Sequence, residues 1–272
     1  MLSCSGLPCV DIALKNGKHL RMLVDLGDEN SIVDSAVAKD LGLAVEPASV
    51  TDRSGKAIPG YGSATLEGAR LGDASLGNIP VLVVNIASAI KKDEMPPADG
   101  VLSYPAFKDR LLRLDYKRKT VSVSELLTAD PPCPGFCGNV TQPTFGNGRP
   151  HVLVTTGFSV NGKPITAQID TLYSGTMLIY PTAVDKLGLK SESATSATQL
   201  FPYTDGGVTM KEAHARKEAF GSKELAGNGP LFFATAQVHV PDGMFDGTVG
   251  QGLLAGHVVY LDFHSNHFWM TN

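Results

Sequence analysis

The alternation of apolar and polar positions along the chain predicts many short strands and few helices. Apolar runs at residues 10–14 and 20–24 flank Asn16-Gly17, and similar runs at residues 152–156 and 165–169 flank Asn161-Gly162. An Asn-Gly pair favours a tight two-residue turn, because both positions of that turn need a positive φ. Each pair of apolar runs therefore predicts a β-hairpin.

The rest of the chain adds mostly strands to this picture. Residues 35–41 and 181–187 predict short helices, because each ends at the glycine of a Leu-Gly-Leu sequence, a residue suited to a helix C-terminus. Residues 191–229 are polar and rich in glycine, and we expect surface loops there. Further strands are expected at residues 64–71, 81–85, 112–116, 120–123, 232–240, 258–263 and 268–270. The fold class predicted from these patterns is all-β.

The two predicted hairpins belong to a longer pattern that occurs twice. An aspartate follows each hairpin, and Asp25 and Asp170 are separated by 145 residues, as are the two Asn-Gly turns. A second pair of similar segments begins at Asp99 and Asp246, 147 residues apart, and contains Asp115 and Asp262, which we expect to cap turns. Two copies of one half-domain predict two lobes related by an approximate two-fold axis, with Asp25 and Asp170 facing each other across it.

The region between the copies is rich in proline and glycine, which is typical of a linker. The predicted organisation is an N-terminal β lobe at residues 1–127, a linker at 128–150 that is rich in proline, glycine and cysteine, and a C-terminal β lobe at 151–272.

Composition and charge exclude several classes of partner. The net charge is -4 and only 18% of residues are charged, so no basic surface for nucleic acid or anionic lipid is expected. No apolar run reaches the roughly 18 residues that a membrane span requires.

Four cysteines occur as two close pairs, Cys4 with Cys9 and Cys133 with Cys137. This grouping favours two disulfides, although three pairings are possible, and reduced thiols or a zinc site are the alternatives. The N-terminus shows no basic region followed by an apolar one, so any export signal has been removed or never existed. The paired cysteines favour removal, and we therefore expect a secreted or periplasmic protein whose signal peptide is absent from this chain.

The residues around the two aspartates resemble those of the pepsin-like and retropepsin-like aspartic proteases. Each half of those proteins carries an Asp-Thr-Gly signature at the end of a strand and, later, an Asp-Gly-aliphatic-aliphatic-Gly segment that threads back towards it. Here the signatures read DLGDENS from Asp25 and DTLYSGT from Asp170, and the threading segments read DGVLS from Asp99 and DGTVG from Asp246. The resemblance covers most of both halves. It implies a two-lobed acid-protease-like fold with a central cleft.

The resemblance implies that Asp25 and Asp170 form a catalytic dyad. Two neighbouring carboxyl groups share one proton, so one can activate a water molecule while the other protonates the peptide carbonyl oxygen. This chemistry needs neither a metal nor a cofactor. The implied partner is a polypeptide that lies in the cleft as an added strand, and the implied state is a monomer, because both halves are present in one chain.

Substrate-binding roles follow from the same resemblance for Gly27, Asp28, Thr171 and Ser174, which surround the dyad. Tyr61, in Gly60-Tyr61-Gly62-Ser63, resembles the tyrosine at the tip of the pepsin flap. The alternative for this segment is an ordinary glycine-rich hairpin.

The signatures also depart from the family pattern. Leu26 replaces a threonine that braces the two lobes, so a brace is expected only from Thr171, and Leu172 replaces a glycine beside the second carboxylate. Asp28 and Glu29 add negative charge near the dyad, which would raise its pKa values, and Ser103 replaces the first threading glycine. The sequence therefore predicts an aspartic endopeptidase, with a catalytically degenerate module that binds peptide or protein as the alternative.

Overall fold

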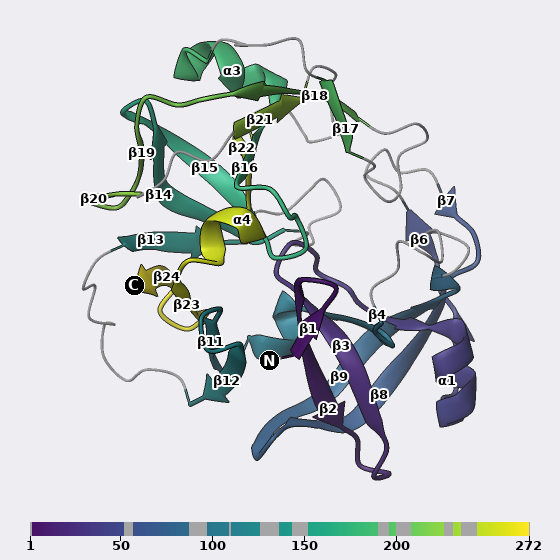
Figure 1. The fold of residues 1–272 in the computed structure, drawn as a ribbon. Coiled ribbons are helices and arrows are strands. Elements are labelled where there is room, and N and C mark those ends of the chain that lie inside the picture. The colour runs from purple at the N-terminus through teal and green to yellow at the C-terminus, as the bar shows by residue number, and fades with distance from the viewer. Residues whose placement is uncertain are drawn as a thin grey trace.

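The computed structural model describes residues 2–51, 57–86, 97–108, 110–125, 136–142, 152–189, 196–199, 208–225, 231–234 and 244–271 (Figure 1). Strands dominate these residues and form two lobes, so the predicted all-β, two-lobed fold is confirmed.

The elements of the N-terminal half begin almost at the first residue. In chain order they are β1 (Leu2–Cys4), β2 (Leu7–Ala13), β3 (His19–Asp25), β4 (Ser31–Asp34), α1 (Ser35–Leu41), β5 (Glu46–Pro47), β6 (Val50–Thr51), β7 (Ala57–Ile58), β8 (Gly62–Leu71), β9 (Ala74–Val84), β10 (Gly100–Ser103), the 3-10 helix η1 (Tyr104–Phe107), β11 (Leu111–Asp115) and β12 (Thr120–Ser124).

The elements of the C-terminal half follow a similar order. They are β13 (Phe136–Thr141), β14 (Val154–Val160), β15 (Lys163–Asp170), β16 (Met177–Ile179), α3 (Pro181–Leu187), β17 (Ser196–Gln199), β18 (Val208–Ala213), β19 (Glu218–Phe220), β20 (Lys223–Glu224), β21 (Leu231–Ala234), β22 (Gly247–Gly250), α4 (Gln251–Leu254), β23 (Val258–Asp262) and β24 (His267–Thr271). In Figure 1, strands β2, β3, β8 and β9 lie at the lower right, and strands β14, β15, β16 and β22 lie above them and to the left.

The N-terminal strands close into a barrel. The order β2-β3-β10-β4-β9-β8 returns to its start because β8 also pairs with β2, through Ala13 and Arg70. Along β3, Leu20, Met22 and Val24 are buried in the barrel interior, whereas Arg21 between them is exposed, as the period of two in a strand requires.

A threading strand lies at the equivalent place in each half. In the N-terminal half, β10 pairs parallel with β3 and antiparallel with β4; in the C-terminal half, β22 pairs parallel with β15 and antiparallel with β16. Both threading strands begin with a glycine for the same reason. A Cβ at Gly100 would lie 2.1 Å from the Ile32 carbonyl oxygen, and one at Gly247 would lie 2.2 Å from the Leu178 carbonyl oxygen.

A sheet formed by strands of both halves joins them. Its centre is the antiparallel pair β11–β23, in which Arg113 lies opposite Tyr260. These two residues are 147 apart, the spacing of the second repeated segment, so the local two-fold axis passes through this pair. Asp115 and Asp262, the predicted turn caps, accept hydrogen bonds from the backbone amides of Arg118 (2.8 Å) and His264 (2.9 Å), which confirms that prediction.

The two helices that the sequence predicts have the expected bounds, but some strands lie in unexpected places. β13 lies within the predicted linker and pairs with β24 and β14. β18, β19 and β20 lie within the predicted loop region 191–229, where they pair with other strands of the C-terminal half. The domain boundaries at residues 127 and 150 stay a prediction.

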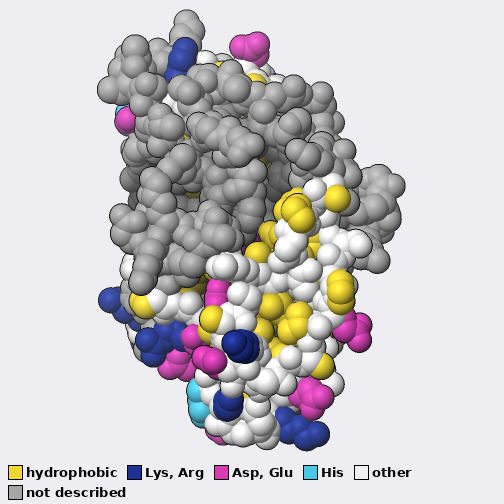
Figure 2. All heavy atoms as spheres, turned by 90° about the vertical axis from the view of Figure 1, so that its right-hand side faces the viewer, with side chains coloured by type: hydrophobic (Ala, Val, Ile, Leu, Met, Phe, Trp, Pro, Cys, Tyr) yellow, Lys and Arg dark blue, Asp and Glu magenta, His cyan; other side chains and the backbone are white. Residues whose placement is uncertain are grey.

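The described surface carries charges of both signs. Figure 2 shows the face that includes α1: hydrophobic side chains gather near the centre of its described part, and acidic and basic side chains lie towards its lower edge. Val45, 46% exposed, is the single exposed large hydrophobic side chain among the described residues. None of the described helices has both the length and the apolar character needed to cross a bilayer.

One buried acid in the C-terminal half makes folding sensitive to pH. Glu218 in β19 is 3% exposed, and its Oε1 atom has no hydrogen-bond partner within the described part of the chain. Burial raises its pKa from 4.5 to about 7, while nearby His214 opposes this shift. Because the folded-state pKa is the higher one, this group favours folding fully below about pH 4.5, and the stabilisation is lost as the pH rises to about 7.

We therefore expect Glu218→Gln to reduce the pH dependence of stability. Between pH 5 and pH 8 the free energy of unfolding of the wild type should fall by up to about 3 kcal/mol more than that of the variant, at about 1.4 kcal/mol per pKa unit. Urea unfolding at the two pH values measures this. Glu67→Gln, at an exposed glutamate, is the matched control. Equal pH dependence in the wild type and Glu218→Gln would contradict the prediction.

Candidate active site

Asp25 and Asp170 occupy equivalent positions in the two halves. Asp25 is the last residue of β3 and lies opposite Ser103 of the threading strand β10. Asp170 is the last residue of β15 and lies opposite Gly250 of β22. Each aspartate thus lies at the point where a strand ends and a loop begins. The strand fixes the position of its backbone, and the loop lies beside its side chain.

Thr171 joins the two signature loops. Its hydroxyl accepts a hydrogen bond from the Leu26 amide (3.0 Å) and donates one to the Val24 carbonyl oxygen (2.6 Å). Thr171 is fully buried, so the Leu26 amide and the Val24 carbonyl group depend on this hydroxyl as their hydrogen-bond partner. Leu26 has no hydroxyl group, so it cannot make the corresponding hydrogen bonds in the other direction, and its side chain packs in the hydrophobic core. The brace therefore comes only from Thr171, as the sequence predicts.

Backbone amides hold both carboxylates. The Gly27 amide donates to Asp25 Oδ1 at 2.6 Å, and the amides of Leu172 and Tyr173 donate to Asp170 Oδ1 at 2.8 and 2.9 Å. Leu172 therefore retains the amide contact that the family assigns to a glycine at this position. These contacts fix the orientation of each carboxyl group relative to its own loop.

The two signature loops approach each other closely. A Cβ atom at Gly27 would lie 2.7 Å from Asp170 Cγ, so the first loop lies directly against the second carboxyl group. The pKa of Asp25 is well above its usual value, first because the group is buried, next because of the negative charge of Asp170, and then because of that of Asp28. The Gly27 amide opposes this shift. The negative charge of Asp170 therefore makes Asp25 harder to ionise.

Gln168 is a residue of the site that the sequence analysis missed. It lies in β15 and is 5% exposed, and its side-chain amide donates a 2.6 Å hydrogen bond to the Gly27 carbonyl oxygen across the two halves. The sequence did contain a signal for this residue: Gln168 is polar, but its neighbours in the strand, Ala167 and Ile169, are apolar.

Ser103, which stands where the family has the first threading glycine, makes two hydrogen bonds. Its amide donates to Ser31 Oγ (3.0 Å), and its hydroxyl donates to the Asn30 carbonyl oxygen (2.6 Å). The first signature loop is therefore tied to β10 directly behind Asp25. Ser31 was not singled out in the sequence either.

Asp28 acts electrostatically on both Asp25 and Tyr61. It is half-buried, and its charge contributes to raising the pKa values of Asp25 and Tyr61, in each case after burial. Tyr61 does not lie at a turn, which corrects the comparison with a flap tip. The Ala48 amide donates to the Tyr61 carbonyl oxygen (3.1 Å), so Tyr61 is paired within one arm of the hairpin that contains β6 and β7.

Two tyrosines that the sequence analysis did not assign lie near Asp170. The hydroxyls of Tyr116 and Tyr173 are buried and have no hydrogen-bond partner among the described residues. Burial raises the pKa of both phenols, and the charge of Asp170 adds to this. Ser174, which follows Tyr173, is exposed. Within the described ranges no group of three or more His, Cys, Asp or Glu side chains could hold a metal ion.

Comparison with known proteins gives one family. Residues 10–106 match the family model described as aspartyl protease. The matched range contains the first signature, the Tyr61 segment and the first threading strand, and it ends before the second signature at Asp170. No curated protein matches the chain.

Proposed function

We propose, from the match of residues 10–106 to the family model described as aspartyl protease, that this chain is an aspartic endopeptidase with Asp25 and Asp170 as its catalytic dyad. The observation that carries the proposal is the meeting of the two signature loops. Thr171 hydrogen-bonds to both neighbours of Asp25, and Gly27 lies against the Asp170 carboxyl group.

The reaction requires one proton shared by the pair. The ionised carboxyl group takes a proton from a water molecule, whose oxygen attacks the peptide carbonyl carbon, while the protonated carboxyl group donates its proton to the carbonyl oxygen. The carboxyl group that took the water proton then gives it to the nitrogen, while the other carboxyl group takes back a proton from a hydroxyl of the tetrahedral intermediate. The carbon–nitrogen bond breaks, and a carboxylic acid and an amine leave. The raised pKa of Asp25 supports this division of roles, because one carboxyl group stays protonated to a higher pH than an isolated aspartate.

The proposed substrate is an extended polypeptide in a cleft between the lobes. An extended chain satisfies its backbone by strand-like pairing and places alternate side chains on opposite sides. Gly27, Asp28 and Ser174 would border it at the dyad, and the hairpin arm that carries Tyr61 would lie along it. Thr171 would act indirectly, because its hydroxyl is already engaged with Leu26 and Val24.

The second candidate is a catalytically degenerate module that binds peptide or protein in the same cleft. Leu26 and Leu172 favour it, because each replaces a residue that the family uses to hold the dyad. The preserved amide contacts to both carboxyl groups favour the enzyme.

A direct test combines turnover with inhibitor binding. We expect the purified protein to cleave an unfolded protein substrate at acidic pH, and a peptide with a hydroxyl group in place of the scissile carbonyl to bind at least about 100-fold more tightly than the matching substrate. Mass spectrometry of the products and calorimetry of inhibitor binding measure the two effects. Binding of both peptides with equal affinity and without cleavage at any pH would support the binding module instead.

We also propose a secreted or periplasmic monomer of the pepsin-like or retropepsin-like type that arose by internal duplication. The Cys4–Cys9 disulfide supports an oxidising compartment. Size-exclusion chromatography tests the monomer, and a stable dimer would contradict it.

A further inference from the structure

The disulfide-bonded hairpin at the N-terminus contacts the second signature loop. Cys4 and Cys9 link β1 to β2 through an S–S bond of 2.14 Å. Around them is a small apolar cluster, here called the hairpin cluster, that is separate from the main core of the barrel. Its members are Cys4, Leu7, Cys9, Leu23, Ala98, Val101 and Leu172. Leu172 is the one member that comes from the C-terminal half.

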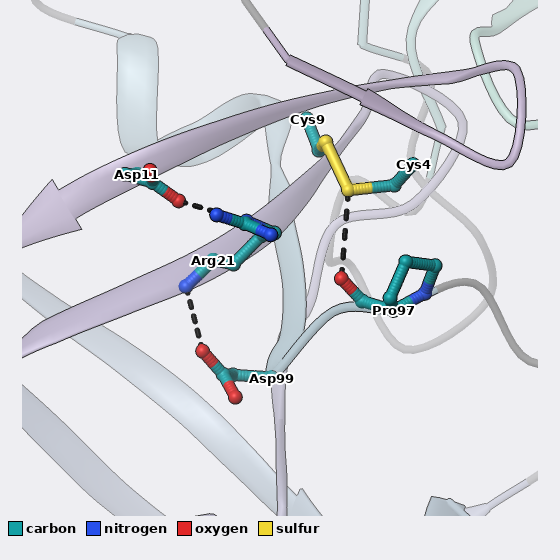
Figure 3. Close-up of polar contacts among 6 residues, drawn as sticks. All are labelled: Cys4, Cys9, Asp11, Arg21, Pro97 and Asp99. Carbon is teal, nitrogen blue, oxygen red and sulfur yellow. Dashed lines mark hydrogen bonds and ion pairs between the residues drawn. A yellow bond between two sulfur atoms is a disulfide. The ribbon is translucent and has the colours of Figure 1, made fainter.

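The N-terminal side of this cluster is firmly anchored. Figure 3 shows the disulfide next to the segment that leads into β10, with Cys4 Sγ 3.6 Å from the Pro97 carbonyl oxygen. A disulfide sulfur carries no hydrogen, so this is a packing contact. In the same segment, Asp99 accepts a 2.7 Å hydrogen bond from the Arg21 amide of β3. The cluster is thus built on β3 and β10, the two strands that pair beside Asp25.

The hairpin also touches the other element next to Asp170. The side-chain amide of Gln251, the first residue of α4, donates a hydrogen bond to the Gly6 carbonyl oxygen at the turn of the hairpin. Gln251 follows Gly250, which lies opposite Asp170 in the sheet. Two contacts therefore join the hairpin to residues that adjoin the second aspartate.

Leu172 couples the hairpin cluster to the Asp170 carboxyl group. Its amide donates to Asp170 Oδ1 at 2.8 Å, and its side chain packs against the cluster. The equivalent residue of the first half is Gly27, 145 residues earlier, where a side chain would collide with Asp170. The two positions therefore differ in what surrounds them: one lacks room for a Cβ, and the other has an apolar cluster beside it.

We propose that Leu172 is a positioning residue that holds Asp170 in register with Asp25 by inserting into the hairpin cluster, in place of the half of the interlobe brace that Leu26 cannot make. The proposal rests on the proposed endopeptidase function. Leu172, which replaces the glycine of the family, would then help to align the two carboxyl groups. The N-terminal hairpin would take part in the same alignment.

The central test restores the family residue with Leu172→Gly. If Leu172 is only a departure from the family signature without a role of its own, Leu172→Gly should have unchanged or higher activity. If Leu172 positions Asp170, kcat of Leu172→Gly should fall by about 10- to 100-fold with little change in KM, because a small displacement of a reacting group has effects of this size. The pH–activity profile should also shift, since the interaction between the two carboxyl groups changes. Leu172→Met, which keeps an apolar side chain of similar volume, should retain activity within about threefold.

Two further variants separate positioning from stability. Leu187→Ala removes a buried leucine of α3 in the main core and should lower the melting temperature without shifting the pH–activity profile. Replacing both cysteines, Cys4→Ala with Cys9→Ala, should lower kcat in the same direction as Leu172→Gly. Wild-type activity and pH profile in Leu172→Gly would overturn the proposal.

A readout without turnover tests the positioning apart from the enzyme activity. The titration of the Asp25 carboxyl carbon, followed by NMR in wild type and Leu172→Gly, should differ in midpoint. A wild type that cleaves nothing would overturn the proposed function, but a changed midpoint would still support the positioning role. Identical midpoints in the two proteins would overturn that role whether or not the protein cleaves peptides.

Discussion

Replacement of Asp25 by asparagine is expected to abolish peptide hydrolysis while leaving the protein folded. Asparagine keeps the shape of the side chain and can still accept the Gly27 hydrogen bond, but it can neither take a proton from water nor share one with Asp170. Loss of a general acid–base group costs about 10²- to 10⁴-fold in rate. We expect kcat to fall by this factor, with substrate still bound, as measured by initial rates and by binding of an uncleaved peptide.

The same substitution is expected to stabilise the fold near neutral pH. The pKa of Asp25 lies well above its usual 3.8 in the folded state, so its contribution to stability is lost as the pH rises above that value. Asparagine does not ionise, and the variant should therefore have a higher melting temperature than the wild type at pH 7. Increased stability together with lost activity is typical of a catalytic group held in an unfavourable environment.

Asp40→Asn is the matched control, because Asp40 is an exposed carboxylate at the end of α1. It should change neither the rate nor the melting temperature appreciably. Full turnover in Asp25→Asn would exclude Asp25 as a catalytic residue.

Gly27→Ala is expected to have an effect nearly as large from the addition of one methyl group. The new Cβ would lie 2.7 Å from Asp170 Cγ and 2.9 Å from Asp170 Cβ, closer than carbon atoms normally approach. Asp170 is held in turn by the amides of Leu172 and Tyr173, so the loops must separate or the carboxyl group must turn away from these donors. A misplacement of about 1 Å costs on the order of 100-fold in rate, and we expect kcat to fall by about that factor.

Gly256→Ala provides the control for Gly27→Ala. Nothing lies within 4 Å of a Cβ at Gly256, and its backbone does not have a positive φ, so the same methyl group should have little effect there. Initial rates and melting temperatures of the two variants measure the difference. Wild-type kcat in Gly27→Ala would mean that Asp170 is not held against the first loop during catalysis.

The prediction of the fold succeeded where local sequence signals are strong. Both Asn-Gly hairpins and both helices could be placed because turn residues and helix-ending glycines act over a few positions. β13 was not predicted, because the proline and glycine content of the region around it indicates a linker. Its pairing with the distant strand β24 outweighs that local tendency. β18 to β20 were missed because weak alternation alone does not reveal such strands, and because β14, a partner of β19, lies far away in the sequence.

The candidate site divides in the same way. The repeated signature led to the proposal of Asp25 and Asp170, and it predicted the brace from Thr171, whose two hydrogen bonds are present in the structure. The roles of Gln168 and Ser31 were not predictable, because each depends on a hydrogen bond to a residue more than 70 positions away. The comparison of Tyr61 with a flap tip was wrong, since its backbone is paired within a hairpin arm.

By itself, the sequence determined the strand-rich, two-lobed character of this protein, because this follows from short-range periodicity and from a spacing that repeats along the chain. The same repeated spacing is the source of the proposed pair of aspartates. Only the tertiary structure decided how Leu172 should be interpreted. In the sequence it is a missing glycine, whereas in the fold its side chain meets a disulfide-bonded hairpin about 165 residues earlier in the chain. The physical reason is that a side chain's role depends on what surrounds it, and those surroundings come from strand pairings between distant segments.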